Sequence, residues 1–165
     1  MDTKIFLLIT LIIFSFSAFA NTPRSTGKYK NWESFVAETE KGKICFAQTV
    51  PTKRAPAAVK RDKSKLFVTF RPSEEIKDEV SLTSGHDYKT SSVTASSGKR
   101  RYSFFSQKDF AWLLDDQEEK KFIQLMKKAT DIIVKARTTK GAETTDHYSM
   151  MGFTKAYNTA KKTCS

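Results

Sequence analysis

Four side chains that can take part in chemistry lie close together near the C-terminus. They are a carboxylate, an imidazole, a hydroxyl and a thiol, from Asp146, His147, Ser149 and Cys164. A cysteine hydrolase needs a thiolate within hydrogen-bond reach of a histidine. One hypothesis is therefore a metal- or thiol-dependent envelope enzyme that uses His147 with Asp146 or Cys164.

The positions of these residues argue against that hypothesis. Cys164 is the penultimate residue, where little of the chain remains to surround and orient it. Asp146 and His147 are sequence neighbours, and neighbouring side chains on a strand point to opposite faces. His86 and His147 lack the spacing of a zinc motif such as H-x-x-x-H or C-x-x-C. We therefore predict no catalytic residues, no metal site and no cofactor.

The first twenty residues have the pattern of a cleaved signal peptide. Lys4 precedes an apolar run, IFLLITLIIFSFSAF, and Ala18-Phe19-Ala20 places small residues where signal peptidase recognises them. Cleavage is expected before Asn21. The run is shorter than the roughly twenty residues of a bilayer span, although an uncleaved anchor is the alternative. We expect a mature protein without a transmembrane span, periplasmic or associated with the outer membrane.

The two cysteines, Cys45 and Cys164, both lie in the mature part of the chain. An even number of cysteines in an exported protein predicts a disulfide, because the compartment is oxidising. The bridge would close a loop of about 120 residues, for which the chain-entropy model gives at most roughly 4–5 kcal/mol.

The chain is strongly basic, with a formal net charge of +11. Because we expect export, the predicted partners are anionic envelope lipid, lipopolysaccharide or a protein, and not nucleic acid. The stretch GKRRYSFF places Lys99, Arg100, Arg101 and Tyr102 beside a predicted turn, a combination that suits an anionic surface. The alternative is that its aromatic residues enter the core. A second cluster, with the same ambiguity, lies in a predicted solvated loop from 51 to 65 and comprises Lys53, Arg54, Lys60, Arg61, Lys63 and Lys65.

Short alternating segments predict a mainly β fold. After a flexible polar leader at 21–30, strand patterns occur at NWESFVAET, ICFAQTV, KLFVTF, DEVSLTSG and DIIVKARTT, with a hairpin turning at 96–99. Turn signals separate these segments. We expect one β-rich domain over 31–165, a β-sandwich or small barrel-like sandwich.

Two segments depart from this pattern and predict short helices. Asp115-Asp116 can cap a helix through QEEKKFIQLMKKA, which has acids in its first turn and lysines in its last. Near the C-terminus an apolar stripe of helical spacing runs along Phe153, Ala156, Tyr157, Ala160 and Cys164. Cys164 would then join the last helix to the first part of the sheet.

Several separated pieces together resemble the invasion-associated locus B family of exported bacterial proteins. The densest piece is TDHYSMMGF at 145–153, which is similar to an Asp-x-Tyr-Ser-Leu-x-Gly-Phe motif of that family. The other pieces, in order, are Trp32, Lys43-Ile44-Cys45-Phe46-Ala47, Arg61-Asp62, Arg71-Pro72, Glu79-Val80-Ser81, a glycine followed by an aromatic residue at 85–88, Ala111-Trp112, Met126-Lys127-Lys128, Ala156 and Cys164. The chain departs from the pattern at Met150, where leucine is usual, and at Ala129, where many relatives have glycine.

This resemblance implies a mainly β protein of the periplasm or outer membrane. Some relatives are linked to entry into host cells, but the family has no established catalytic residues to carry over. We therefore expect a non-enzymatic envelope protein that acts by binding an envelope component or a host-cell surface.

Overall fold

The computed structural model describes residues 22–165, so the predicted signal peptide lies outside the described residues. Its strands are β1 (Arg24–Tyr29), β2 (Trp32–Thr39), β3 (Gly42–Thr49), β4 (Lys53–Ala55), β5 (Lys65–Arg71), β6 (Ile76–Thr83), β7 (Val93–Ser97), β8 (Arg100–Gln107), β9 (Phe110–Trp112), β10 (Asp131–Arg137) and β11 (Glu143–Ser149). The helices are α1 (Asp116–Lys128) and α2 (Phe153–Thr163), and a short 3-10 turn, η1, spans Pro72–Glu74. The mainly β fold with two helices is confirmed.

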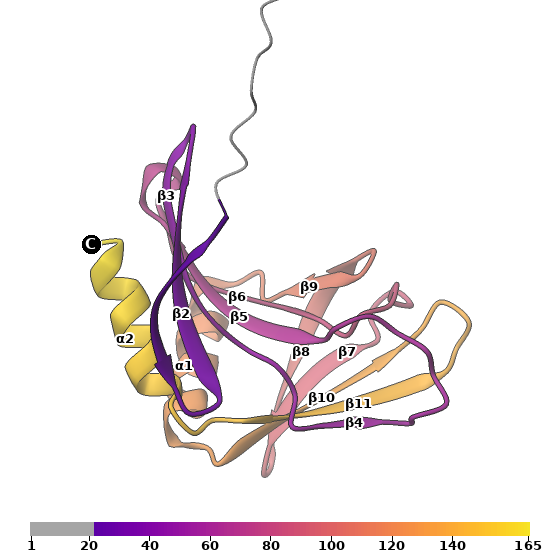
Figure 1. The fold of residues 1–165 in the computed structure, drawn as a ribbon. Coiled ribbons are helices and arrows are strands. Elements are labelled where there is room, and N and C mark those ends of the chain that lie inside the picture. Colours follow the sequence, from indigo (N-terminus) through magenta and orange to yellow (C-terminus); the bar gives the residue numbers. More distant parts are fainter. Residues whose placement is uncertain (1–21) are drawn as a thin grey trace, which may run out of the picture.

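All strands belong to one antiparallel sheet with the order β1-β2-β3-β5-β6-β9-β8-β7-β10-β11-β4. The sheet bends back on itself at β8 (Figure 1). The first half of β8, Arg100 to Phe104, pairs with β7, and its second half, Phe105 to Gln107, pairs with β9. One strand therefore serves both layers of a sandwich, which is the barrel-like variant of the predicted architecture.

Strand alternation explains how the two layers share one core. Inward residues of the first layer, such as Leu66, Val68 and Val80, are fully buried. Inward residues of the second layer, such as Ile132 and Val134, lie in the same hydrophobic cluster. Successive side chains of a strand point to opposite faces, so the residues between them form the outer surface of each layer.

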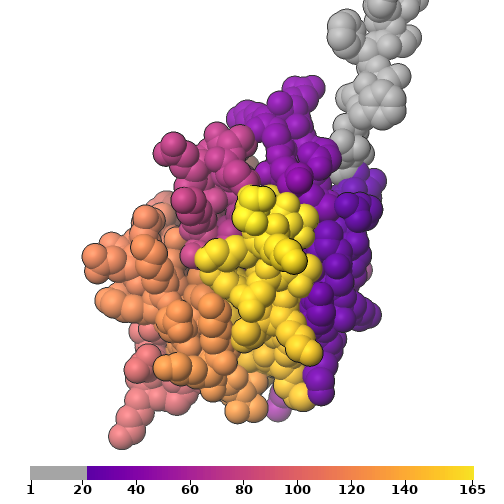
Figure 2. Space-filling view, turned by 90° about the vertical axis from the view of Figure 1, so that its left-hand side faces the viewer, coloured from indigo at the N-terminus to yellow at the C-terminus, as the bar shows by residue number. Residues whose placement is uncertain are grey.

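The helices complete the core at one end of the sandwich. The Asp115 carboxylate caps α1 by accepting the backbone N–H groups of Gln117 and Glu118 at 2.8 and 2.9 Å. Phe122 of α1 is fully buried against Tyr102 and Phe104 of β8. In the space-filling view α2 (yellow) lies between the first strands (indigo to purple) and the segment that contains α1 (orange) (Figure 2).

The C-terminal segment joins the first strands at several points, and the predicted disulfide is one of them. A disulfide connects Cys45 in β3 to Cys164 at the end of α2, with the two Cα atoms 5.8 Å apart. The indole of Trp32, fully buried, donates to the carbonyl of Ser149 at 2.9 Å. Gly152 starts α2 with φ of 95°, and a Cβ there would collide with the carbonyl oxygen of Tyr29.

Two predictions about loops are wrong. Residues 24–29, expected to be part of a flexible leader, form β1, which pairs along β2. The predicted solvated loop at 51–65 contains β4, which pairs with β11 from Lys53 to Ala55. Both strands lie at an edge of the sheet, where polar side chains are common and the apolar alternation that reveals a central strand is weak.

Candidate binding surface

The hairpin tip between β7 and β8 is exposed and basic. The chain turns at Gly98, which has φ of 55°, and Lys99, Arg100 and Arg101 are all exposed. Tyr102 does not belong to this surface, which corrects the prediction. Its side chain is 8% exposed and meets the Phe122 ring with the centroids 5.0 Å apart. The alternation of β8 turns Arg101 outward and Tyr102 into the core.

Strand register extends this basic surface across the outer side of the second layer. Lys53 of β4 pairs with His147, His147 with Ile133, Ile133 with Ser96, and Ser96 with Arg101. Lys135 lies in the adjacent row, two residues from Ile133 on the same face. We call the set Lys53, Lys99, Arg101 and Lys135 the basic face. Arg100 alternates with Arg101 along β8, so it points to the side of Tyr102 at the exposed tip and lies outside this set.

Few acidic groups compensate this charge within the described residues. Asp131 and Glu143 occupy the two ends of the β10–β11 pair on the outer side. Glu143 is engaged by Arg137, whose Nη2 lies 2.6 Å from its Oε1. No salt bridge of the part of the chain that the structure describes involves a member of the basic face. The basic face therefore presents uncompensated positive charge to solvent.

The second basic cluster of the sequence separates into different environments. The guanidinium of Arg61 donates to both carboxylate oxygens of Asp146, at 2.6 and 2.8 Å. The side chains of Arg61 and Asp146 are 3% and 1% exposed, so this is a buried ion pair and not a surface group. Lys65 lies on the other layer, with its Nζ 5.9 Å from the centroid of Phe67.

The residues considered for catalysis are not brought together. Asp146 points into the core and is held by Arg61, whereas His147 points to the basic face. The Cys164 sulfur is bonded to Cys45, so it is not a nucleophile in the oxidised protein. His86 has its Nε2 2.9 Å from the Thr144 hydroxyl. Among residues 22–165 no cluster of three or more His, Cys, Asp or Glu side chains could hold a metal ion.

Two buried tyrosines lie around the Arg61–Asp146 pair. Burial raises the pKa of Tyr88 and of Tyr148, and the negative charge of Asp146 acts in the same direction on both. Ser84 acts on the pKa of the Tyr88 hydroxyl in the opposite direction, whereas the Tyr148 hydroxyl has no hydrogen-bond partner among the described residues. Both phenols therefore stay protonated at neutral pH.

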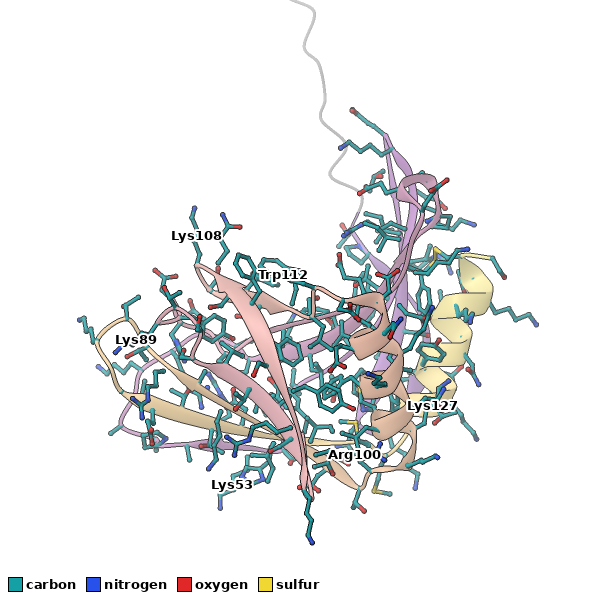
Figure 3. The ribbon with its side chains drawn as sticks, turned by 180° about the vertical axis from the view of Figure 1, so that it is seen from behind. Lys53, Lys89, Arg100, Lys108, Trp112 and Lys127 are labelled. Atoms are coloured by element: carbon teal, nitrogen blue, oxygen red, sulfur yellow. A yellow bond between two sulfur atoms is a disulfide. The ribbon has the colours of Figure 1, made fainter. Side chains whose placement is uncertain are left out.

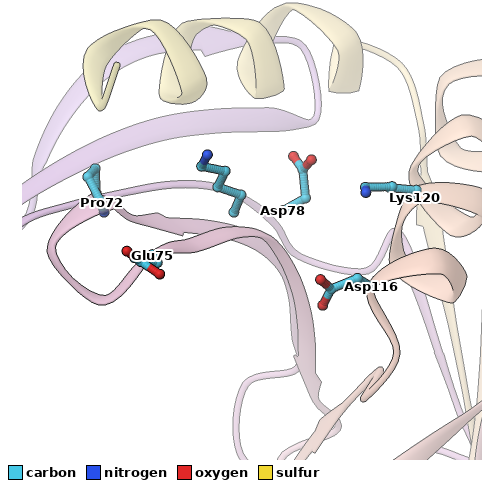
Figure 4. Close-up of a pocket in the computed structure, with 6 residues that line it drawn as sticks. Pro72, Glu75, Asp78, Asp116 and Lys120 are labelled. Atoms are coloured by element: carbon cyan, nitrogen blue, oxygen red, sulfur yellow. The ribbon is translucent and has the colours of Figure 1, made fainter.

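A cavity of about 560 Å³ lies between the β5–β6 turn and α1 (Figure 4). Its lining mixes charges of both signs, from Glu75, Lys77, Asp78, Asp116 and Lys120, together with Pro72. The Asp78 carboxylate accepts a hydrogen bond from the Tyr157 hydroxyl at 2.6 Å. The lining therefore consists of the hydrogen-bonded carboxylate of Asp78 and of solvated charges. It contains no nucleophile paired with a base.

Among the acids of residues 22–165, Glu119 of α1 has the clearly shifted pKa. Its side chain is 7% exposed and its Oε1 accepts the backbone N–H of Val80 at 2.9 Å. Burial, reinforced by the charges of Glu79, Asp116 and Asp78, raises the pKa of Glu119 to about 7. The Glu119 carboxyl accepts the N–H of Val80 just beyond Ser81, where the pairing of β6 with β9 ends. We therefore assign Glu119 a structural role.

No protein-family model, curated protein or solved structure matches this chain. The resemblance to invasion-associated locus B proteins therefore stays a prediction from the sequence. Within the described residues no helix is long and apolar enough to cross a membrane.

Proposed function

We propose that this protein is a non-enzymatic cell-envelope protein that acts by binding an anionic envelope component, lipid or lipopolysaccharide, through the basic face. The observation that carries the proposal is the cross-strand row from Lys53 through His147 to Arg101, with Lys135 beside it. The row crosses five paired strands, β4, β11, β10, β7 and β8, and places these charges on one side of the sheet.

Export to the envelope is supported by three features. The N-terminus has the pattern of a signal peptide, and the disulfide suits an oxidising compartment. The resemblance to invasion-associated locus B proteins points to the same location. A role in host-cell entry has no support from the structure and is not part of the proposal.

The basic face is suited to phosphate-rich surfaces by its chemistry. Each Lys or Arg near an anionic membrane contributes about 1 kcal/mol, so the four groups of the basic face supply at most a few kcal/mol in total. The attraction acts over a Debye length, about 8 Å at physiological ionic strength. Binding of this kind is reversible and strongly salt-dependent.

Co-sedimentation of the processed protein with vesicles tests the proposal. Retention on vesicles of phosphatidylglycerol and phosphatidylcholine should fall steeply as salt is raised, and vesicles of phosphatidylcholine alone should retain little protein. Equal retention on the two kinds of vesicle, or none on either, would reject binding to an anionic surface.

A further inference from the structure

The outer side of the first layer carries a continuous set of aromatic residues that sequence inspection does not reveal. Strand register aligns Phe35 with Phe46, and a second row runs from Phe67 through Ser81 and Trp112 to Phe105. Phe110 lies two residues from Trp112 on the same side of β9. We call the outward-facing rings the aromatic face: Phe35, Phe46, Phe67, Phe105, Phe110 and Trp112.

The rings of the aromatic face contact one another from strand to strand. Ring centroids are 5.2 Å apart for Phe35–Phe46, 6.2 Å for Phe46–Phe67, 6.4 Å for Phe67–Phe110 and 5.9 Å for Phe110–Trp112. The planes of Phe35 and Phe46 are within 16° of parallel, and their centroids are too close together for coplanar rings that lie edge to edge. The two rings therefore stack face to face. Ring edges, and not free ring faces, are therefore presented to solvent there.

The set is apolar and partly solvent-exposed. Phe105 is 52% exposed, and the other five rings are half-buried. Ser81 lies on the same outer side between Phe67 and Trp112, yet it is only 6% exposed because large neighbours flank it. A contiguous apolar patch of this kind on a soluble protein marks an interaction site.

The aromatic face and the basic face lie on opposite sides of the molecule. Trp112 lies along one side of the sandwich, and Lys53 lies along the other (Figure 3). A flat anionic surface in contact with the basic face cannot reach the aromatic face. The aromatic face therefore requires a different partner.

The charge on the aromatic face is nearly balanced, unlike that of the whole chain. The charged residues that point outward from β1, β2, β5 and β6 are Lys28, Glu33, Lys65, Arg71 and Glu79, and Arg71 is paired with Glu79 at 2.7 Å. In a protein of net charge +11, two copies repel each other wherever positive surfaces meet. The nearly balanced aromatic face is the side on which two copies can approach at the least electrostatic cost.

We propose that the aromatic face binds the aromatic face of a second copy of this chain, forming a two-fold symmetric dimer. Aligned packing of two sheet faces, roughly 10 Å apart, is the ordinary way to bury such surfaces. The strands β2, β3, β5 and β6 are roughly 25 Å long, whereas β9 and the paired half of β8 have three residues each and are about 10 Å long. At about 4.8 Å strand spacing the projected area is on the order of 500 Å². This is below the roughly 800 Å² per partner of a standard interface, so the dimer belongs to the class of small, reversible interfaces.

The dimer has a consequence that rests on the proposed function. With the aromatic faces joined, the two basic faces point away from each other, so one dimer contacts two anionic surfaces at once. Anionic vesicles should then cluster when the dimer is added, and a monomer would only coat them.

Multi-angle light scattering over a range of protein concentrations, without lipid, tests the dimer. Phe105→Glu places a charge at the most exposed ring and should weaken association on the order of tenfold or more. Met151→Glu is the matched control, because Met151 is 51% exposed and lies before α2. Both variants lower the net positive charge of the chain by the same amount, so the electrostatic repulsion between two copies falls equally in both. Only Phe105→Glu should weaken the dimer.

Trp112 supplies a second readout that does not depend on a variant that folds poorly. The chain has two tryptophans, and Trp32 is fully buried in the monomer. Dilution of the dimer should shift the emission of Trp112 to longer wavelength, and Trp112→Phe should abolish that shift.

A monomer at all concentrations up to about 1 mM, or equal weakening by Phe105→Glu and Met151→Glu, would overturn the dimer. The outcomes also separate the two proposals. A monomer that binds anionic vesicles keeps the proposed function and rejects the dimer, whereas a dimer that ignores vesicles does the reverse.

Discussion

The two outer surfaces of this protein arise from one sheet and one alternation of side chains, yet their contents differ completely. The first layer exposes rings among nearly balanced charges, and the second exposes lysine and arginine between mostly small and polar residues. β8 belongs to both surfaces, because Arg101 and Phe105 point outward from its two halves. The fold thus sets where a surface lies, and a few outward residues decide what it can bind.

The first prediction separates the inner and outer sides of β11. Arg61→Met leaves the carboxylate of Asp146 buried without its main partner, and we expect the free energy of unfolding to fall by about 3 kcal/mol. His147→Ala, a change one residue away on the basic face, should cost less than about 0.5 kcal/mol. Urea denaturation measures both.

A compensating variant checks the cause of that loss. Arg61→Met combined with Asp146→Leu removes both charges and should recover most of the stability. If Arg61→Met and His147→Ala had equal effects, the inner and outer sides of β11 would not differ as the structure indicates.

The second prediction concerns the disulfide, which joins β3 of the first layer to the end of α2. Replacing Cys45 and Cys164 together by serine should lower the free energy of unfolding by about 3 kcal/mol, because the bridge closes a loop with a sequence separation of 119 residues. Thermal unfolding monitored by circular dichroism measures the loss. Reduction of the wild-type protein should give a comparable shift, and an unchanged melting temperature would contradict the assigned role.

The third prediction is a pH dependence from Glu119, beneath the first layer. Its pKa is about 7 in the folded protein and 4.5 in an unperturbed chain. Between these values the folded state holds a proton that the unfolded state releases, so stability decreases as pH rises from 4.5 to 7. Glu119→Gln should remove this decrease and stabilise the protein by about 2 kcal/mol at pH 8, with little difference at pH 4.

Urea denaturation at the two pH values measures that effect. Glu118→Gln, at a neighbouring solvated position of α1, is the control and should leave the pH dependence unchanged. A Glu119→Gln variant that is no more stable than wild type at pH 8 would show that burial of the ionised Glu119 carboxylate does not destabilise the folded protein.

The sequence predicts local structure well because the signals are local. The cap at Asp115, the stripe from Phe153 to Cys164 and the turn near Gly98 each follow from a short run of residues, and all three are present. The stretch GKRRYSFF alone allows Tyr102 on the binding surface, and strand alternation places it in the core. The edge strand β1 was missed because its polar composition has no apolar alternation.

The surfaces could be predicted only in part, because they depend on register. Phe35, Phe46, Phe67 and Trp112 are separated by many residues and become neighbours only when β2, β3, β5, β6 and β9 align. Likewise, nothing near Arg61 in the sequence indicates that its partner is Asp146, 85 residues away. The basic hairpin tip was found because its charges are consecutive, whereas its continuation to Lys53 and Lys135 was not.

The fourth prediction is the measurement that tests the central claim most directly. Two variants, each lacking three positive charges, are compared for binding to phosphatidylglycerol-containing vesicles at low and physiological salt. The first, Lys53→Gln/Arg101→Gln/Lys135→Gln, removes three charges from the basic face. The second, Lys128→Gln/Lys155→Gln/Lys162→Gln, removes three charges from the side of the helices.

All six positions are exposed, so neither variant should change the free energy of unfolding by more than about 0.5 kcal/mol per substitution. Our account predicts that the basic-face variant binds on the order of tenfold or more weakly, with a shallower salt dependence, while the helix-side variant stays close to wild type. Equal losses for the two variants would show that net charge, and not the basic face, governs binding, and would contradict the account.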